Sequence, residues 1–324
     1  MSERRLRCAV IGAGKMGSLH AQKYAAAPEW ELVAVVDIDA AVAARVAQRV
    51  NAAALTDYRE VLGTVDAVSV AVPTALHHRV ARDFLAAGCH VLVEKPIAVT
   101  VAEADELIAL ARRMRCTLQV GHVERFNAAV LALDLERRRP RFIEATRIAP
   151  FSTRGADVSV VLDLMIHDID LILALVDAEV ERVDAVGTPV FTDDIDIANA
   201  RLVFADGCVA NVTASRVSQK VERKMRLFLA DGYASIDFLN NVVQRVRLGE
   251  PRVVDGAPNA LNETLTVDAG DALAAEIRCF GDCIRGGREP PTSGAAARRA
   301  LALAARIGAL LDRGGRDGPR RADA

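Results

Sequence analysis

The sequence lacks several features that mark other classes of protein. None of its six cysteines forms a C-x-x-C pair, and no apolar run reaches 18 residues without a charge. We therefore expect buried free thiols in a reducing cytoplasm and no transmembrane helix. Residues 1–14 are too short, and too soon interrupted by glycine, to form a signal peptide.

A strong net charge is also missing. The chain carries 41 basic and 43 acidic residues, a formal net charge of −2, which argues against binding nucleic acid through bulk charge. Aromatic residues are scarce at 4%, which we attribute to a GC-rich coding bias. What the chain does have is 324 residues that are 52% hydrophobic, an ordinary globular composition with room for two domains.

The first part of the chain alternates between short apolar runs and helical patterns. The first apolar run covers residues 6–17 and ends in glycines, and further predicted strands occupy 31–37, 66–73, 89–96 and 116–122. Predicted helices occupy 15–27, 39–51, 75–87 and 100–115. Because the strands are apolar on both faces, they predict a parallel sheet covered by helices on both sides. We assign residues 1–122 to this α/β domain.

After about residue 123 the predicted strands no longer alternate with helices. Predicted strands follow one another at 142–149, 180–191, 195–205, 208–216, 224–231 and 233–238, with one long helix at 159–176. This order predicts a second α/β domain over 123–313, built on a mostly antiparallel open sheet. Helices at 270–285 and 294–312 close it, the last one able to pack back on the first domain, and residues 314–324 form a flexible tail.

The segment GAGKMG supplies a G-x-G-x-x-G motif at Gly12, Gly14 and Gly17. It follows a predicted strand and opens a predicted helix, which is the context that dinucleotide binding requires. Such glycines let the backbone approach a pyrophosphate at the helix N-terminus. Lys15 and Met16 would then lie near the phosphates or the nicotinamide half of the cofactor, whereas a purely structural turn is the alternative.

The end of the second predicted strand indicates which cofactor is bound. Asp37 stands there and can accept hydrogen bonds from a ribose diol, while its charge would repel a 2′-phosphate. Ile38 follows where an NADP enzyme often has a basic residue. We therefore predict NAD.

The predicted helix at 159–176 is apolar nearly all round yet carries Asp163, His167 and Asp170 on one face. Asp168 points elsewhere and is expected to reach solvent. One interpretation is that Asp163 and His167 satisfy each other inside the core. Another is that the carboxylate orients an imidazole that acts as a general base. Their spacing could also hold a metal ion, but hydride chemistry needs none and we predict no metal.

The segment VLVEKP ends an apolar strand with a charged residue, Lys95, followed by Pro96. A solvated loop would explain this, and so would a placed proton donor. In a parallel sheet the carboxyl end of a strand is where ligands bind, and a desolvated lysine titrates readily.

These motifs together resemble the Gfo/Idh/MocA oxidoreductase family: the glycines, then VPTALH at 72–77, then EKP at 94–96, then D-x-x-x-H-x-x-D at 163–170. The resemblance covers nearly the whole chain. It implies a Rossmann domain followed by an α/β domain whose open sheet supports oligomerisation, and hydride transfer between NAD(P) and a sugar or cyclitol carbon. It also makes an unusual Lys95–Pro96 peptide geometry possible.

The resemblance also assigns roles to residues. Lys95, Asp163 and His167 match its catalytic positions, and the roles of Lys95 and His167 in proton transfer could be exchanged. Further residues expected at the cofactor are Pro73, Thr74, His77, Glu94 and Gln119. His20 and His90 receive no assignment.

The middle of the chain resembles the nucleotide-sugar branch of the family, in 121–130, 147–154 and 157–175. It is most similar to enzymes that oxidise the C3 hydroxyl of UDP-N-acetylglucosamine, whose 3-keto product an aminotransferase converts to a 3-amino sugar for lipid A. Ala128 departs from this pattern, where proline is expected. Expected substrate contacts are His122, Arg125, Asn127, Arg154, Asp163 and His167. Arginines 125, 147 and 154 could bind a diphosphate or be merely solvated.

Two alternatives remain open at this point. The substrate could be another sugar, an inositol or a UDP-uronic acid, or the chain could be a non-catalytic NAD-binding regulator, because fold alone does not fix function. For an enzyme we expect a cytoplasmic homodimer or homotetramer, with a downstream aminotransferase as a possible partner.

Overall fold

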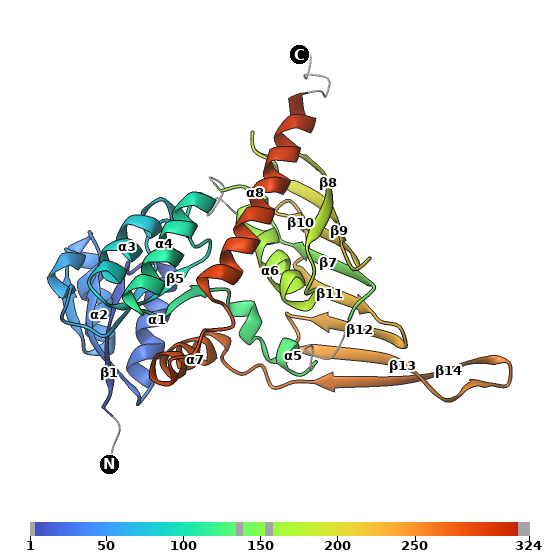
Figure 1. Ribbon diagram of the computed structural model, residues 1–324, viewed down its shortest axis with the longest axis horizontal. Coiled ribbons are helices and arrows are strands. Elements are labelled where there is room, and N and C mark those ends of the chain that lie inside the picture. The colour runs from blue at the N-terminus through green and yellow to red at the C-terminus, as the bar shows by residue number, and fades with distance from the viewer. Residues whose placement is uncertain (1–3, 134–138, 153–157, 317–324) are drawn as a thin grey trace. The chain divides into compact units, whose positions relative to one another are not determined.

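The computed structural model describes residues 4–133, 139–152 and 158–316, and the chain forms two compact units (Figure 1). The first unit comprises Met1–Phe126 and Asp271–Leu301, and the second comprises Asn127–Gly270 and Ala302–Ala324. Among the helices in these described ranges, none is long and apolar enough to cross a membrane.

A six-stranded sheet forms the centre of the first unit, in the order β3-β2-β1-β4-β5-β6. The strands are β1 (Leu6–Ile11), β2 (Trp30–Val36), β3 (Ala53–Leu55), β4 (Ala67–Val70), β5 (His90–Glu94) and β6 (Leu118–Gly121). All neighbours pair in parallel, which confirms the predicted sheet, although the short β3 was not foreseen. The order reverses between β1 and β4, and such a point is where open α/β sheets bind ligands.

Helices connect these strands and cover the sheet. They are α1 (Lys15–Ala26), α2 (Ala40–Val50), α3 (His77–Ala86) and α4 (Val101–Met114), with 3₁₀ turns η1 (Tyr58–Val61), η2 (Thr74–Leu76) and η3 (Val123–Phe126). Helix α1 packs against α2, and α3 packs against α4. Because right-handed crossovers run outward from β1 and β4 in opposite directions, the two pairs cover opposite faces.

Two helices near the C-terminus complete the structure. The first packs in the first unit through aromatic contacts, and the second has residues in both units. Helix α7 (Ala272–Gly286) belongs to the first unit, where the ring of Phe280 stacks on Trp30 at 5.8 Å between centroids. Tyr24 of α1 meets Trp30 edge-on at 4.9 Å. Helix α8 (Gly294–Arg316) starts in the first unit and continues into the second. Since α8 extends to Arg316, the predicted tail begins too early; residues 317–324 lie outside the described residues.

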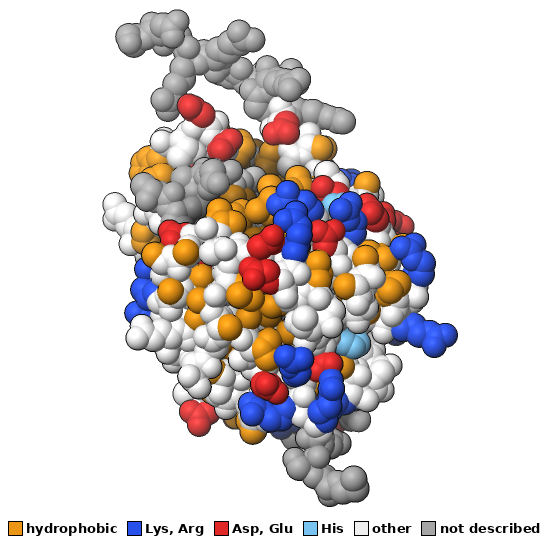
Figure 2. All heavy atoms as spheres, turned by 90° about the vertical axis from the view of Figure 1, so that its left-hand side faces the viewer, with side chains coloured by type: hydrophobic (Ala, Val, Ile, Leu, Met, Phe, Trp, Pro, Cys, Tyr) orange, Lys and Arg blue, Asp and Glu red, His pale blue; other side chains and the backbone are white. Residues whose placement is uncertain are grey.

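Charged side chains of both signs are interspersed on the face of the first unit that Figure 2 shows, with apolar side chains between them. No single-signed stripe crosses this face. This face therefore agrees with the near-neutral net charge of the chain.

An eight-stranded sheet forms the second unit, in the order β14-β13-β12-β11-β7-β10-β9-β8. Its strands are β7 (Phe142–Ile148), β8 (Val180–Thr188), β9 (Ile197–Phe204), β10 (Val209–Ser215), β11 (Glu222–Phe228), β12 (Gly232–Asp237), β13 (Val242–Val254) and β14 (Ala257–Thr266). Only the β7–β10 pair is parallel, which confirms the mostly antiparallel sheet.

The long β13–β14 hairpin was missed in the sequence. Its signal is the pair Asp255–Gly256, both with positive φ (51° and 78°), between two alternating segments. An Asp-Gly turn of this kind matches the twist of a hairpin.

The predicted helix at 159–176 is two elements rather than one. A π-helical turn over Val161–Met165 precedes α6 (Ile166–Leu175), and a four-residue helix, α5 (Ala128–Leu131), lies earlier in the chain. A π-turn inserts an extra residue into the helical ladder and is frequent at functional sites. Helix α6 packs on β7 and β10 and buries one face of the sheet.

The prediction that Asp168 reaches solvent is wrong. Its side chain is 1% exposed and forms a two-point ion pair with Arg147 of β7: Nε donates to Oδ2 at 2.9 Å, and Nη2 donates to Oδ1 at 3.0 Å. The guanidinium also lies 5.7 Å from the ring centroid of Phe238. The pair fixes α6 on the sheet, so the buried Arg147 has a structural role, instead of binding a diphosphate or being solvated.

Replacing Asp168 by Ala should therefore destabilise the protein by about 3–5 kcal/mol, because it leaves a buried, uncompensated guanidinium. Urea unfolding followed by circular dichroism would measure this. The matched control is Asp184→Ala, which removes an exposed partner of Arg182 (59% and 65% exposed) and should change stability by less than about 1 kcal/mol. Equal effects of the two substitutions would contradict this account.

Candidate functional site

The glycine motif between β1 and α1 adopts a conformation that a side chain would block. Gly12 has a φ of 91°, and a Cβ there would lie 2.6 Å from the carbonyl oxygen of Ala71. A Cβ on Gly17 would lie 1.7 Å from the carbonyl oxygen of Gly12. At Gly14, the N-cap of α1, a Cβ would meet nothing within 4 Å, so this is the open side of the loop. The residues thus fit a pyrophosphate held close to the backbone at the N-terminus of α1.

The carboxylate of Asp37, just after β2, supports this loop. Its Oδ2 accepts a hydrogen bond from the backbone N–H of Ala13 at 2.7 Å, and its Oδ1 accepts one from Asp39 at 3.0 Å. The side chain is partly exposed, and Ile38 is 93% exposed. Asp37 therefore stands at the carboxyl end of β2 with oxygen lone pairs left for a ribose diol.

The other expected cofactor residues of the first unit also follow strands. Lys15, which is exposed, and Met16, which is partly buried, lie within the motif between Gly14 and Gly17, after β1; Pro73 (exposed) and Thr74 (partly buried) follow β4. Lys95 follows β5 and is partly exposed, and the Lys95–Pro96 peptide is cis. Since β1, β2, β4 and β5 are parallel neighbours, these residues lie along one edge of the sheet.

His77 joins two of these loops. Its Nδ1 lies 2.8 Å from the carbonyl oxygen of Pro96, and its Nε2 lies 2.9 Å from that of Val72. Burial lowers the pKa of His77, and the two carbonyls only partly oppose this effect. Each ring nitrogen that carries a hydrogen donates to the carbonyl that it faces. The ring connects the loop after β4 to the loop that carries Lys95.

A buried chain of hydrogen bonds leads to the backbone of Lys95, and no motif in the sequence predicted it. Glu94, 9% exposed, accepts from Nε2 of His20 at 2.9 Å and from the backbone N–H of Lys95 at 3.3 Å. Nδ1 of His20 lies 3.0 Å from Oγ of Ser69, which lies 2.9 Å from the hydroxyl of Tyr24. The chain links α1, β4 and β5, so it ties the start of the cofactor helix to the strand end that presents Lys95.

The environment of Glu94 keeps it ionised. Burial by itself raises the pKa of this carboxyl, but the hydrogen bond and charge of His20, followed by the charge of Lys95 and its backbone N–H, lower it below the usual range. A Cβ on Gly121 of β6 would come within 3.0 Å of the same carboxylate. The glycine therefore leaves the space that Glu94 occupies.

The candidates in β6 and in the turn after it differ in burial and in bonding. Gln119 is fully buried, and its Nε2 donates to the carbonyl of Glu276 at 3.1 Å. His122 is 1% exposed and Arg125 is partly exposed in η3. Oδ1 of Asn127 caps α5 by accepting from the N–H of Ala129 at 2.9 Å, which gives this residue a structural function.

The second unit carries the remaining candidates. Asp163 lies in the π-turn and His167 in the first turn of α6, and both are partly exposed, whereas Asp170 is 1% exposed. Arg154 lies outside the described residues. Within the described ranges, no group of three or more His, Cys, Asp or Glu side chains could hold a metal ion.

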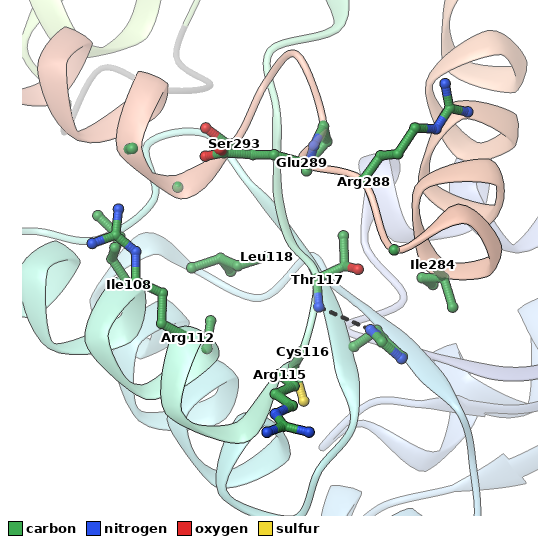
Figure 3. Close-up of a pocket in the computed structure, with 16 residues that line it drawn as sticks. Ile108, Arg112, Arg115, Cys116, Thr117, Leu118, Ile284, Arg288, Glu289 and Ser293 are labelled. Atoms are coloured by element: carbon green, nitrogen blue, oxygen red, sulfur yellow. Dashed lines mark hydrogen bonds between the residues drawn. The ribbon is translucent and has the colours of Figure 1, made fainter.

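A cavity of about 410 Å³ lies at the opposite edge of the first sheet (Figure 3). It borders His90 at the start of β5 and Thr117 just before β6, whose backbone N–H donates to Nδ1 of His90 at 2.8 Å. Arg112, Arg115 and Arg288 also line it. Parallel sheets bind ligands at the carboxyl ends of their strands, so this cavity at the amino ends is not the candidate site.

The fold and the glycine loop together define an NAD-binding Rossmann protein. Residues 6–122 match the model of an oxidoreductase family with an NAD-binding Rossmann fold, and residues 120–235 match the GFO/IDH/MocA C-terminal domain. The chain belongs to the Gfo/Idh/MocA family of oxidoreductases, as the motifs in the sequence predicted.

Relatives of known name cover nearly the whole chain. UDP-N-acetylglucosamine 3-dehydrogenase of Acidithiobacillus ferrooxidans is 42% identical over 303 residues, which are 93% of this chain and 96% of the relative. A solved structure of that enzyme superposes with a TM-score of 0.90, covering 96% of this chain and 98% of the other. The scyllo-inositol 2-dehydrogenase (NAD(+)) of Bacillus subtilis is 26% identical, with 89% of each chain covered.

The lowered pKa of Glu94 makes the free energy of unfolding depend on pH. Because the folded pKa lies below the unfolded value of about 4.3, the carboxylate stabilises the fold above that pH, and this contribution is lost as the pH falls through the folded pKa. The difference in free energy of unfolding between wild type and Glu94→Gln should be present at about pH 5 and shrink below about pH 4.

Urea titrations across this pH range would measure the difference. The control is Glu60→Gln, which changes an exposed glutamate of the same unit and should alter the free energy of unfolding little. A Glu94→Gln difference that grows as the pH falls would contradict the prediction.

Proposed function

We propose that this protein catalyses the NAD-dependent oxidation of the C3 hydroxyl of UDP-N-acetylglucosamine to the 3-keto nucleotide sugar. The observation that carries the proposal is the similarity, along nearly the full length of both chains, to an enzyme named for this reaction. The glycine loop, Asp37 and the end of β5 supply a matching cofactor edge in the first unit.

The cofactor in this proposal is NAD rather than NADP. Asp37 would accept hydrogen bonds from the ribose diol and repel a 2′-phosphate, and the exposed Ile38 offers no positive charge to such a phosphate. Bound NAD supplies one piece of chemistry, the acceptance of a hydride from the reacting carbon. Pro73, Thr74, His77, Glu94 and Gln119 are proposed to shape the cofactor edge.

Lys95 and His167 are the proposed proton-transfer residues. Lys95 stands at the carboxyl end of β5 on a loop held by Glu94 and His77, so its amine can be directed at a substrate hydroxyl. The imidazole of His167 would take the hydroxyl proton, and Asp163, four residues earlier on the same helical segment, would orient it. The two residues could exchange roles, with Lys95 as the acceptor.

His122, Arg125, Asn127 and Arg154 are proposed to contact the nucleotide sugar. A diphosphate favours arginine, whose planar group binds two oxygens at once. Oδ1 of Asn127 also accepts the capping bond of α5, so this residue stands at the start of that helix.

A second candidate substrate is an inositol or another sugar, because a scyllo-inositol 2-dehydrogenase aligns with most of this chain. A UDP-uronic acid belongs to the same set of alternatives. A non-catalytic NAD-binding regulator is disfavoured, since Lys95, Asp163 and His167 are all present and a regulator has no need of them.

The proposed enzyme works in the cytoplasm as a homo-oligomer and supplies an aminotransferase that makes the 3-amino sugar of lipid A. Support for the oligomer comes from the sheet face opposite α6. This face includes a hollow of about 600 Å³ lined by polar side chains, among them Glu144, Asn211 and Lys224. A broad half-exposed sheet face of this kind can pair with that of a second copy.

Mass spectrometry of the sugar after incubation with the purified protein and NAD tests the function. An amine trap is included because alcohol oxidation by NAD is often uphill. Loss of two hydrogens from UDP-N-acetylglucosamine, or capture at C3, is the expected outcome. Turnover confined to inositols, free sugars or UDP-uronic acids would move the assignment to the second candidate, and no turnover with NAD bound would favour the regulator.

Replacing Lys95 by Ala should lower turnover by about 10²–10⁴-fold, the usual contribution of a positioned acid–base group, while NAD affinity stays nearly unchanged. Steady-state kinetics and NADH fluorescence titration measure the two quantities. The control Lys23→Ala removes a lysine that pairs with Asp271 in the same unit, and it should leave turnover near wild type. Near-normal turnover of Lys95→Ala would refute the role of Lys95.

A further inference from the structure

Two exposed phenylalanines of the second unit contact each other. The ring centroids of Phe151 and Phe191 lie 5.8 Å apart at an interplanar angle of 83°, with exposed fractions of 38% and 66%. All nine phenylalanines of the chain are among the described residues, and the other seven are buried or partly buried. A pair of large apolar rings kept in water is unfavourable for an isolated subunit, which indicates a ligand or partner.

One buried carboxylate holds the turn that carries Phe191 through several hydrogen bonds. Oδ2 of Asp196, a fully buried residue, accepts hydrogen bonds from the backbone N–H groups of Val190, Phe191 and Thr192 at 2.8, 2.6 and 2.9 Å. Its Oδ1 accepts from Nε of Arg216 at 2.8 Å. Although burial raises the pKa of Asp196, these donors lower it well below its usual range, so the anchor is charged at neutral pH. A ring presented on such a turn loses little freedom when it binds.

The same anchor connects the ring pair to the proposed catalytic segment. Nη1 of Arg216 donates to the carbonyl of Val158 at 2.7 Å. Val158 directly precedes the helical turn in which the backbone N–H of Asp163 donates to the carbonyl of Ser159. Ser215, at the end of β10, pairs with both Ile148 and Ile197. The end of β7, the end of β10 and the β8–β9 turn therefore share one edge of the sheet, and β8, β9 and β10 are neighbours in Figure 1.

We propose that Phe151 and Phe191 form the nucleobase subsite of this enzyme, against which the pyrimidine ring of the nucleotide-sugar substrate stacks. The inference rests on the proposed function and deepens it. Under that function the sugar lies at Asp163 and His167, and the base is the flat, apolar part of the ligand that remains. Every base has a π-face that stacks on an aromatic side chain without demanding a particular hydrogen-bond pattern.

Isothermal titration of the full-length protein with NADH present tests the subsite. Three probes are compared: UDP-N-acetylglucosamine, UDP, and N-acetylglucosamine 1-phosphate, which lacks the base. Phe191→Ala should weaken both uridine ligands by roughly 5- to 150-fold, the range for loss of one stacked base, and leave the sugar phosphate unchanged. In turnover KM should rise at constant kcat, because stacking is equal in the ground and transition states.

The chain offers matched controls. Val190→Ala removes apolar surface from the same turn (Val190 is 44% exposed) without removing a ring, and it should leave all three affinities near wild type. Phe191→Trp keeps a ring and should retain binding of the uridine ligands. Circular dichroism of each variant checks that it is folded.

The outcomes separate the possible failures. If wild type does not bind or oxidise UDP-N-acetylglucosamine, the proposed function fails and the subsite with it. If wild type does so and Phe191→Ala binds the uridine ligands normally, only the subsite is refuted. If light scattering shows that the oligomer of Phe191→Ala has a lower mass than that of wild type, at unchanged ligand affinity, the rings form an interface between copies instead.

Discussion

The carboxylate of Glu94 is the buried group on which the first unit most depends. It takes a hydrogen bond from His20 of α1, sits against Gly121 of β6, and accepts the N–H of Lys95. An ionised carboxylate inside a protein is tolerated only when its lone pairs are satisfied. Meeting that demand fixes the helix that would hold the pyrophosphate and the loop that presents the lysine in one arrangement.

Charge pairs organise the second unit by the same principle. The buried pair of Arg147 and Asp168 fixes α6 to β7, and the pair of Arg216 and Asp196 fixes a turn and the approach to the π-helix. Each leaves its neighbours partly exposed: His167 beside the first pair, and Phe191 beside the second. The buried charges thus hold in place the elements that carry these two residues.

The distinction between structural and chemical polar residues was the hardest to make from sequence. The predicted helix at 159–176 has four ionisable residues among apolar ones, and their spacing alone predicted that Asp168 reaches solvent. The π-turn at Val161–Met165 changes the helical phase, and the partner of Asp168 comes from a strand some twenty positions earlier. Neither fact is local, so periodicity could not supply them.

The sequence by itself determined the fold class and the cofactor loop. Strands apolar on both faces require covering helices, and a glycine motif between a strand and a helix encodes its own backbone geometry, because steric exclusion at Gly12 and Gly17 is a short-range effect. Only the tertiary structure decided which polar groups meet. His20, Ser69 and Glu94 come from separate elements, as do Phe151 and Phe191, and their contacts exist because strand order and register bring them together. Hydrogen bonds and ring contacts act over a few ångströms in space, whatever the distance along the chain.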